Sequence, residues 1–131
     1  MTPIFVTGIG TGVGKTVISA ILAEALRADY WKPIQAGLDA TDTETVRALL
    51  TNKESRLFPE AVRLKAPLSP HAAAKLDSKN IRISDIKPPD TKNALIIEGA
   101  GGLLVPLNEE ELMVDLVRAL NATVVVVSRH Y

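Results

Sequence analysis

The glycine-rich segment near the start of the chain constrains the fold most. It reads Thr7-Gly8-Ile9-Gly10-Thr11-Gly12-Val13-Gly14-Lys15-Thr16, and it separates a short β-prone apolar run at residues 2–6 from apolar residues at helical spacing through Leu26. Strand-like residues, a glycine turn and a 3.6-residue period in this order predict a strand, a tight loop and a helix beginning near Lys15.

This segment has the chemistry of a phosphate-binding loop. Successive backbone N–H groups and the positive end of the helix can face one anion, Lys15 adds a full charge, and the hydroxyl of Thr16 can ligate Mg²⁺. Gly8 and Gly14 are separated by five residues rather than the usual four. A plain glycine turn, or half of a dinucleotide fingerprint, is the alternative, but Lys15 followed by Thr16 favours a triphosphate.

The rest of the chain alternates predicted strands and helices. Strands that are apolar throughout are typical of a parallel sheet covered on both faces. We therefore predict an α/β, three-layer sandwich with a mainly parallel sheet of the P-loop NTPase type, forming a single ATP-binding domain over residues 1–131. The expected strands are 30–34, 93–98 and a fully buried 122–127, and the expected helices begin near Thr41 or Asp42, at Ser69-Pro70, at 83–86 and at 112.

Composition excludes several other classes of function. The 15 basic and 15 acidic side chains cancel, which disfavours nucleic acid and membrane surfaces as partners. The chain has no cysteine, so disulfides, thiolate metal sites and cysteine nucleophiles are excluded. No secretory leader and no apolar run of membrane-spanning length is recognisable, and we expect a cytoplasmic protein.

Three further polar side chains stand where predicted strands end. Glu98 follows a buried strand, where an NTPase needs a metal ligand or water organiser, although it could also belong to a plain glycine turn. Lys32 could face a phosphate, or it could be a surface lysine. Asp42, like Asp39, could bind Mg²⁺ or cap the next helix. Ligands of parallel sheets bind at the carboxyl ends of the strands, so we expect these segments to meet there.

Four motifs together resemble the dethiobiotin synthetase family. They are the glycine-rich segment ending in Lys15-Thr16, then Lys32-Pro33-Ile34-Gln35-Ala36-Gly37, then Ser69-Pro70-His71, and finally Glu98-Gly99-Ala100-Gly101-Gly102-Leu103-Leu104-Val105-Pro106-Leu107. Their order and spacing agree with the family along nearly the whole chain. The resemblance implies a ligase that closes the ureido ring of dethiobiotin from 7,8-diaminononanoate, CO2 or bicarbonate, and ATP, in biotin biosynthesis.

The resemblance also implies roles for individual residues. Lys32 and Lys15 would be catalytic, and Mg²⁺ would be held by Thr16, Asp42 and Glu98. Thr11 and Ala36 would contact the substrate, and full-length members are expected to form homodimers. The ATP-binding residues would be Gly12, Val13, Gly14, Lys15, Thr16, Val17, Asp42, Glu98, Gly99, Ala100 and Gly101.

The sequence departs from the family in three ways. Gly10 and Gly12 stand where some members carry acidic residues, and Ala36 replaces a frequent Ser or Thr. Members are much longer, so we expect this chain to be an N-terminal part of the fold, apparently truncated, and to be poorly active by itself.

The alternatives to a dethiobiotin synthetase are another P-loop ATPase, an amide synthase of the same fold, or a non-catalytic nucleotide-binding fragment. Partitioning-type ATPases usually carry a lysine at the position of Gly10, which speaks against them.

Overall fold

The computed structural model describes residues 1–130 and contains strands and helices in alternation. The strands are β1 (Ile4–Gly8), β2 (Asp29–Trp31), β3 (Ile34–Ala36), β4 (Leu57–Phe58), β5 (Val62–Leu64), β6 (Leu95–Glu98) and β7 (Thr123–Val127). The helices are α1 (Lys15–Leu26), α2 (Asp42–Leu49), α3 (Pro70–Leu76) and α4 (Met113–Ala119), with a 3₁₀ turn η1 (Ile83–Asp85).

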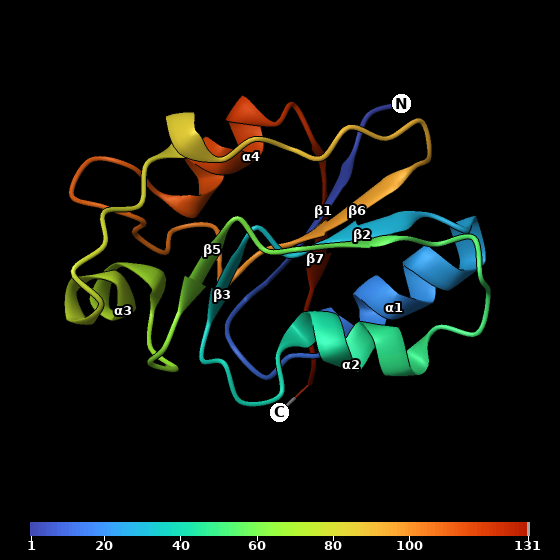
Figure 1. Cartoon of the computed structure of the whole chain (residues 1–131), viewed down its shortest axis with the longest axis horizontal. Helices are drawn as coiled ribbons and strands as arrows, with labels where there is room; N and C mark the ends of the chain where they lie inside the picture. Colours follow the sequence, from blue (N-terminus) through green and yellow to red (C-terminus); the bar gives the residue numbers. More distant parts are fainter. Residues whose placement is uncertain (131) are drawn as a thin grey trace.

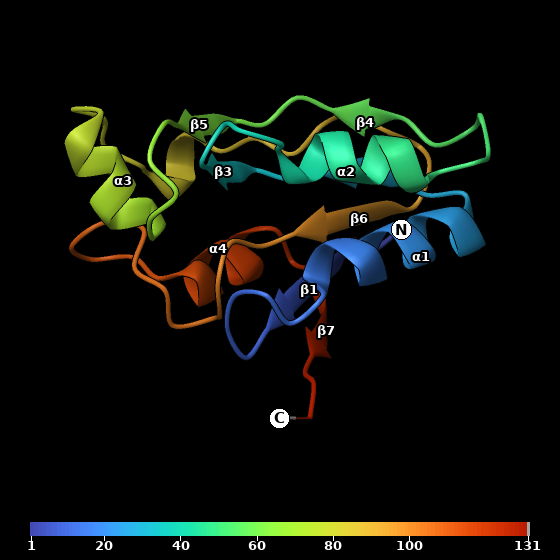
Figure 2. The same ribbon diagram turned by 90° about the horizontal axis from the view of Figure 1, so that it is seen from below.

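A five-stranded parallel sheet forms the middle layer. Its strand order is β4-β2-β6-β1-β7, and every pairing is parallel. Helices α1 and α2 lie on one side of this sheet, and α4 with η1 lies on the other (Figure 1). Figure 2 shows the sheet running from β4 at one edge to β7 at the other. The predicted α/β three-layer architecture is therefore confirmed.

The alternation of side chains along the central strands explains why both faces are covered. Phe5 and Ile97 pack in the core that includes α4, whereas their neighbours Val6 and Ile96 pack in the core beneath α1 and α2. All four side chains are fully buried. Because successive strand residues point to opposite faces, a strand that is apolar throughout must bury both of them.

The predicted strand at residues 30–34 is wrong as a single element. The chain leaves the main sheet at Lys32 and Pro33, and β3 pairs instead with β5 in a separate two-stranded parallel sheet. Proline has no N–H to donate to a ladder, so a strand cannot continue unchanged through it. The carbonyl of Pro33 accepts a hydrogen bond from the N–H of Val62 at 2.9 Å, which starts the second sheet.

Of two helix predictions in the middle of the chain, one needs correction and one is confirmed. Of the predicted helix at residues 83–86, only Ile83–Asp85 is helical, as the 3₁₀ turn η1, and Ile86 is already extended. Helix α3 begins at Pro70 as predicted, but the Ser69 side chain makes no capping hydrogen bond. Pro70 supplies the helix start through its fixed φ angle.

Strand β7 is an edge strand and is not fully buried as predicted. It pairs with β1 alone among the described residues, and only Val127 of its five residues is buried. Val124 is 36% exposed and Val126 is 59% exposed. A continuous valine run indicates a strand but does not say how many neighbours the strand has.

We expect this edge to promote self-association of the 131-residue chain, because an unpaired apolar strand edge is a template for pairing with another chain. Val126→Lys should reduce concentration-dependent association in sedimentation velocity, since a lysine on an edge strand opposes such pairing. Leu76→Lys, at a side chain that is 68% exposed on α3, is the control. Equal association of both variants and the unchanged chain would contradict this expectation.

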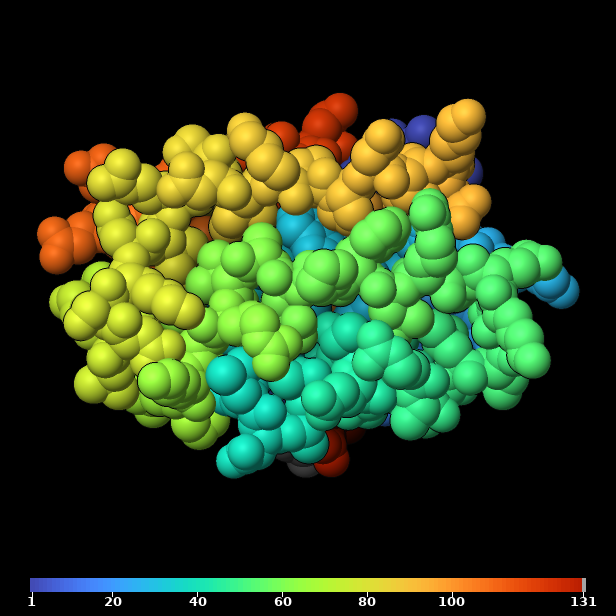
Figure 3. All heavy atoms as spheres, viewed as in Figure 1, coloured from blue at the N-terminus to red at the C-terminus, as the bar shows by residue number. Residues whose placement is uncertain are grey.

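The front face in the orientation of Figure 1 is built mostly from the middle of the chain, coloured cyan through yellow in Figure 3. Within residues 1–130, no helix has the length and apolar character needed to cross a lipid bilayer.

The loops that follow β1, β3 and β6 converge at the carboxyl edge of the main sheet. There Thr16 donates a hydrogen bond to Glu98, and Lys32 donates to Asp42 and to the carbonyl of Gly99.

Candidate functional site

The phosphate-binding loop joins β1 to α1 in a conformation that only glycine adopts readily. Gly14, immediately before α1, has φ of 103°, and Gly12 has φ of 70°. A Cβ placed on Gly8 would lie 2.5 Å from Cγ2 of Val13, so the loop closes tightly on the end of β1. The first backbone N–H groups of α1 are thereby presented at the loop, where an anion is favoured.

Lys15 is buried in this loop, with 8% of its surface exposed. Its Nζ donates a hydrogen bond to the carbonyl of Gly10 at 3.0 Å. Burial and the nearby ammonium of Lys32 lower the pKa of Lys15, with Glu98 and Asp42 opposing them. Lys15 therefore places a buried positive charge, whose hydrogen bond goes to a neutral carbonyl, beside the loop of a chain whose net charge is zero.

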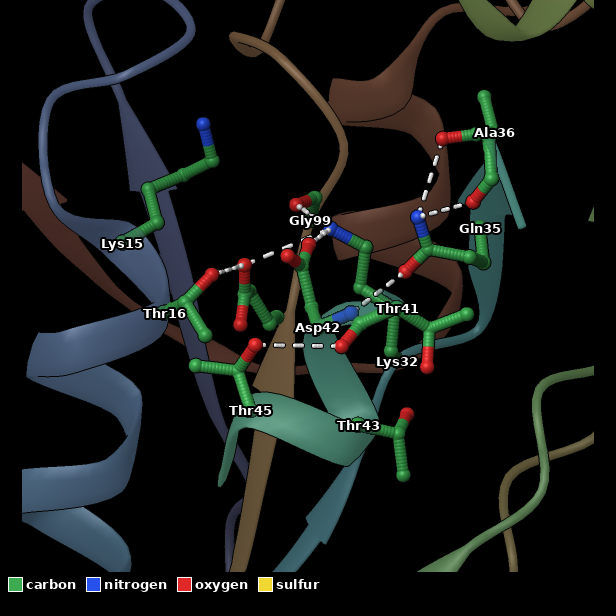
Figure 4. A network of polar contacts seen from close by, with 12 residues as sticks. Lys15, Thr16, Lys32, Gln35, Ala36, Thr41, Asp42, Thr43, Thr45 and Gly99 are labelled. Carbon is green, nitrogen blue, oxygen red and sulfur yellow. Dashed lines mark hydrogen bonds and ion pairs between the residues drawn. The ribbon is translucent and has the colours of Figure 1, made fainter. Parts of the chain in front are cut away.

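Lys32 lies between two carboxylates from distant parts of the chain. Its Nζ is 2.5 Å from Oδ2 of Asp42 and 3.4 Å from Oε2 of Glu98, and it donates to the carbonyl of Gly99 at 3.1 Å. Figure 4 shows Lys32 reaching to Asp42 and Gly99, while Lys15 points along the phosphate-binding loop. Lys32 is 4% exposed, which excludes the alternative of a surface lysine.

Glu98 ends strand β6 and is 1% exposed. Its Oε2 accepts a hydrogen bond from the hydroxyl of Thr16 at 2.9 Å, and its Oε1 accepts one from the hydroxyl of Tyr30 at 2.8 Å. Burial raises the pKa of the Glu98 carboxyl, and the charge of Lys32 opposes this rise. Burial also raises the pKa of the Tyr30 phenol, so this hydroxyl acts as a donor to the carboxylate.

Asp42 is the first residue of α2, but it does not cap the helix. Thr41 does so: its hydroxyl accepts from the N–H of Glu44, and the Glu44 carboxylate accepts from the N–H of Thr41. The Asp42 side chain is therefore available to the site. Burial acts to raise the pKa of the Asp42 carboxyl, but the positive charge and the hydrogen bond of Lys32 hold this pKa below its usual value.

The oxygen donors at this edge suit a magnesium ion. Mg²⁺ in nucleotide sites is bound by one or two carboxylates together with substrate phosphates and water. Glu98 and Thr16 are already in contact through a hydrogen bond, and Lys32 links both carboxylates. Among residues 1–130 there is no cluster of three or more His, Asp or Glu side chains able to hold a metal by itself. A magnesium site here would thus need the phosphates of a nucleotide.

A cavity of about 720 Å³ brings most of the predicted residues together. Of the predicted residues, Val13 and Gly99 are absent from its wall: the Val13 side chain is buried, and Gly99 contributes through its carbonyl to Lys32. The predicted residues that line it are Thr11, Gly12, Gly14, Lys15, Thr16, Val17, Lys32, Ala36, Asp42, Glu98, Ala100 and Gly101.

Sequence reasoning assigned no role to several residues of this site. Gln35 joins the two ends of the loop between β3 and α2: its Nε2 donates to the carbonyls of Ala36 and Gly37, and its Oε1 accepts from the N–H of Asp42 at 3.2 Å. Residues 67–70 and Val105 form another part of the cavity wall. Tyr30 lies behind Glu98. Neither a glutamine in a short strand nor a buried tyrosine carries a sequence signal of such a role.

Several known proteins are similar to this chain over nearly its whole length. A protein named ATP-dependent dethiobiotin synthetase BioD from Christiangramia forsetii is 56% identical over 128 residues, which cover 97% of this chain and 61% of the relative. Proteins of the same name from Cytophaga hutchinsonii and Paramagnetospirillum magneticum are 52% and 51% identical, covering 100% and 98% of this chain and 64% and 62% of the relatives.

The chain thus spans a little over three fifths of the length of these curated relatives. A family model described as an AAA domain matches residues 2–131. That match covers the phosphate-binding loop, the parallel sheet and the lysine–carboxylate cluster in one continuous stretch. On this match and on its fold, the chain belongs to the AAA domain family of P-loop proteins.

Proposed function

We propose that this chain carries the ATP site of a dethiobiotin synthetase, an ATP-dependent ligase that closes the ureido ring from 7,8-diaminononanoate and CO2. The identity of 51–56% to relatives of that name supports this proposal. One observation in the structure carries it furthest: a second buried lysine, Lys32, shares a cavity with the phosphate-binding loop and lies within hydrogen-bond reach of two acidic side chains.

The proposed reaction has three steps. One amine of the substrate adds to CO2, loses a proton and becomes a carbamate. A carbamate oxygen then attacks the γ-phosphorus of ATP, and ADP leaves. The second amine attacks the carbonyl carbon of this phosphorylated carbamate and loses a proton, the bond from that carbon to the phosphate oxygen breaks so that inorganic phosphate leaves, and the five-membered urea ring is closed.

The phosphate-binding loop serves the second step. The backbone N–H groups at residues 12–17 would hold the phosphates, and the ammonium of Lys15 would offset charge on the transferred phosphoryl group. The hydrogen bond from Lys15 to the carbonyl of Gly10 would be exchanged for one to a phosphate oxygen. Gly99, Ala100 and Gly101 would form the neighbouring wall of the nucleotide site.

Lys32 would stabilise negative charge on the carbamate. Its ammonium is held by Asp42, Glu98 and the carbonyl of Gly99, so its position is set before substrate arrives. A fixed positive charge in a buried site stabilises charge that develops during the reaction more than a mobile one in water. Thr11 and Ala36 line the same cavity and are the proposed substrate contacts.

Thr16, Asp42 and Glu98 would hold Mg²⁺, which supplies charge neutralisation on the β- and γ-phosphates when bound. Because all three residues provide oxygen, they suit this hard cation better than zinc or copper. We further propose that the natural protein acts in the cytoplasm, where ATP is available, and that it does so as a homodimer, as the resemblance implies.

The decisive experiment measures ADP release with MgATP and bicarbonate, in the presence and absence of 7,8-diaminononanoate. It is carried out on the natural protein that carries this sequence, with the 131-residue chain assayed beside it. We expect the diamine to stimulate ADP release by the natural protein. A Lys15→Ala version is the matched control for contaminating ATPases.

The outcomes separate the candidate functions. Diamine-dependent ADP release supports the synthetase. ATP binding without any response to the diamine would refute it and indicate another P-loop ATPase, an amide synthase or a non-catalytic nucleotide-binding module.

A further inference from the structure

Tyr30 is a buried residue next to the site to which the proposed mechanism gives no role. It lies in the middle of β2 with no exposed surface. Its aromatic ring belongs to the core beneath α1 and α2, together with Val6 and Ile96. Its hydroxyl, however, does not serve this core: it donates to Oε1 of Glu98 at 2.8 Å.

The register of the sheet explains how this contact arises. Tyr30 is paired with Ile96, and Glu98 follows two residues later on the same face of β6. Two residues of a parallel strand span about 6.6 Å, a distance that the long tyrosine side chain can bridge. A shorter side chain at this position could not reach the carboxylate.

The two oxygens of Glu98 consequently have different surroundings. Oε1 faces Tyr30, which is buried, while Oε2 faces Thr16 and Lys32 at the cavity. Without the phenol, Oε1 would be a buried acceptor with no partner in the described structure. Leaving a buried acceptor unpaired is unfavourable, so the carboxylate would turn to share the donors at the cavity.

We propose that Tyr30 is a positioning residue for Glu98. By occupying Oε1, it keeps Oε2 directed at Thr16 and the metal side of the cavity. Partners of metal-ligating carboxylates act in this way, and their removal typically weakens metal binding about 10- to 100-fold. The inference rests on the proposed role of Glu98 toward Mg²⁺, and it adds a residue that contacts neither nucleotide nor metal.

The test measures the ATP affinity of the 131-residue chain by isothermal titration calorimetry in EDTA and at a series of free Mg²⁺ concentrations, and the Mg²⁺ affinity is taken from the Mg²⁺ dependence of ATP binding. Tyr30→Phe keeps the ring and removes only the hydroxyl. We expect it to weaken Mg²⁺ binding about tenfold. ATP affinity without metal should change less than about twofold, because Lys15 and the loop backbone are untouched.

Two companion variants separate positioning from a merely structural effect. Ser19→Ala removes another buried hydroxyl on α1 that has no hydrogen-bond partner, and it should leave Mg²⁺ affinity unchanged. In a Glu98→Gln background, Tyr30→Phe should add little, since residues that act through one another are not additive. Thermal unfolding of each variant verifies that it is folded.

If ATP binding by the parent chain depends on Mg²⁺ and folded Tyr30→Phe has the same Mg²⁺ affinity, the positioning role of Tyr30 is wrong. The proposed metal role of Glu98 would not be affected by that result. Equal losses in Tyr30→Phe and Ser19→Ala would do the same, because they would reflect packing rather than Glu98. A parent chain whose ATP binding does not respond to Mg²⁺ would overturn the proposed metal role of Glu98 and, with it, the positioning role of Tyr30.

Discussion

Lys15→Ala is expected to lower the affinity for ATP by about 10- to 100-fold, the equivalent of one hydrogen bond to a charged group at about 1.5–3 kcal/mol. The reason is local. The ammonium of Lys15 is buried beside the loop, and its present partner is a neutral carbonyl of Gly10. A phosphate oxygen is a stronger partner for this charge, and alanine offers none.

The measurement is titration of the 131-residue chain with ATP, with and without Mg²⁺. Lys53→Ala is the matched control, because Lys53 is an exposed lysine outside the cavity. Its removal changes the net charge equally and should leave ATP affinity within about twofold, as expected for exposed charges screened by salt. Equal losses in both variants would show that bulk charge, and not the loop, determines binding.

Lys32→Ala is expected to reduce diamine-dependent turnover by about 100- to 1,000-fold, the range seen when one fixed donor to a developing charge is removed. ATP affinity should fall much less than in Lys15→Ala, because Lys32 faces the two carboxylates and not the phosphate-binding loop. The natural protein that carries this sequence is the sample for turnover, and the 131-residue chain is the sample for binding.

Removing Lys32 also leaves two carboxylates facing each other, so stability must be controlled. Breaking a buried ion pair by deleting one partner costs about 3–5 kcal/mol. Lys32→Gln keeps a stem and an amide donor and should therefore unfold at a higher temperature than Lys32→Ala while turnover stays low. Lys32→Ala and Lys15→Ala variants with the same loss of ATP affinity would contradict the separate roles assigned to the two lysines.

Much of the site was predictable from local sequence. The loop around Gly14, the capped start of α2 and the strand ending in Glu98 each depend on residues close together in the chain, where turn chemistry and period determine the structure. The meeting of the segments that follow β1, β2 and β6 was also predictable, because parallel strands of one sheet place their carboxyl ends together. Their side chains do meet, through Lys32 and Thr16. Asp42 reaches this edge from the loop after β3, which belongs to the second sheet.

Other predictions failed because the extent and burial of a strand depend on which strands it pairs with. Residues 30–34 have the composition of one strand, but β2 pairs with β4 and β6 whereas β3 pairs with β5. The valine run of β7 has the composition of a central strand but lies at an edge. Pairing partners are distant in sequence, and their choice leaves no mark in the local pattern.

The sequence by itself determined the phosphate-binding loop and the parallel α/β class, because these follow from the backbone freedom of glycine and from the period of apolar residues within short segments. Only the tertiary structure decided that Lys32 lies between Asp42 and Glu98 and that Tyr30 reaches Glu98. Each of these depends on strand register or on which side chain is buried beside another, and such contacts join residues as far as 68 positions apart.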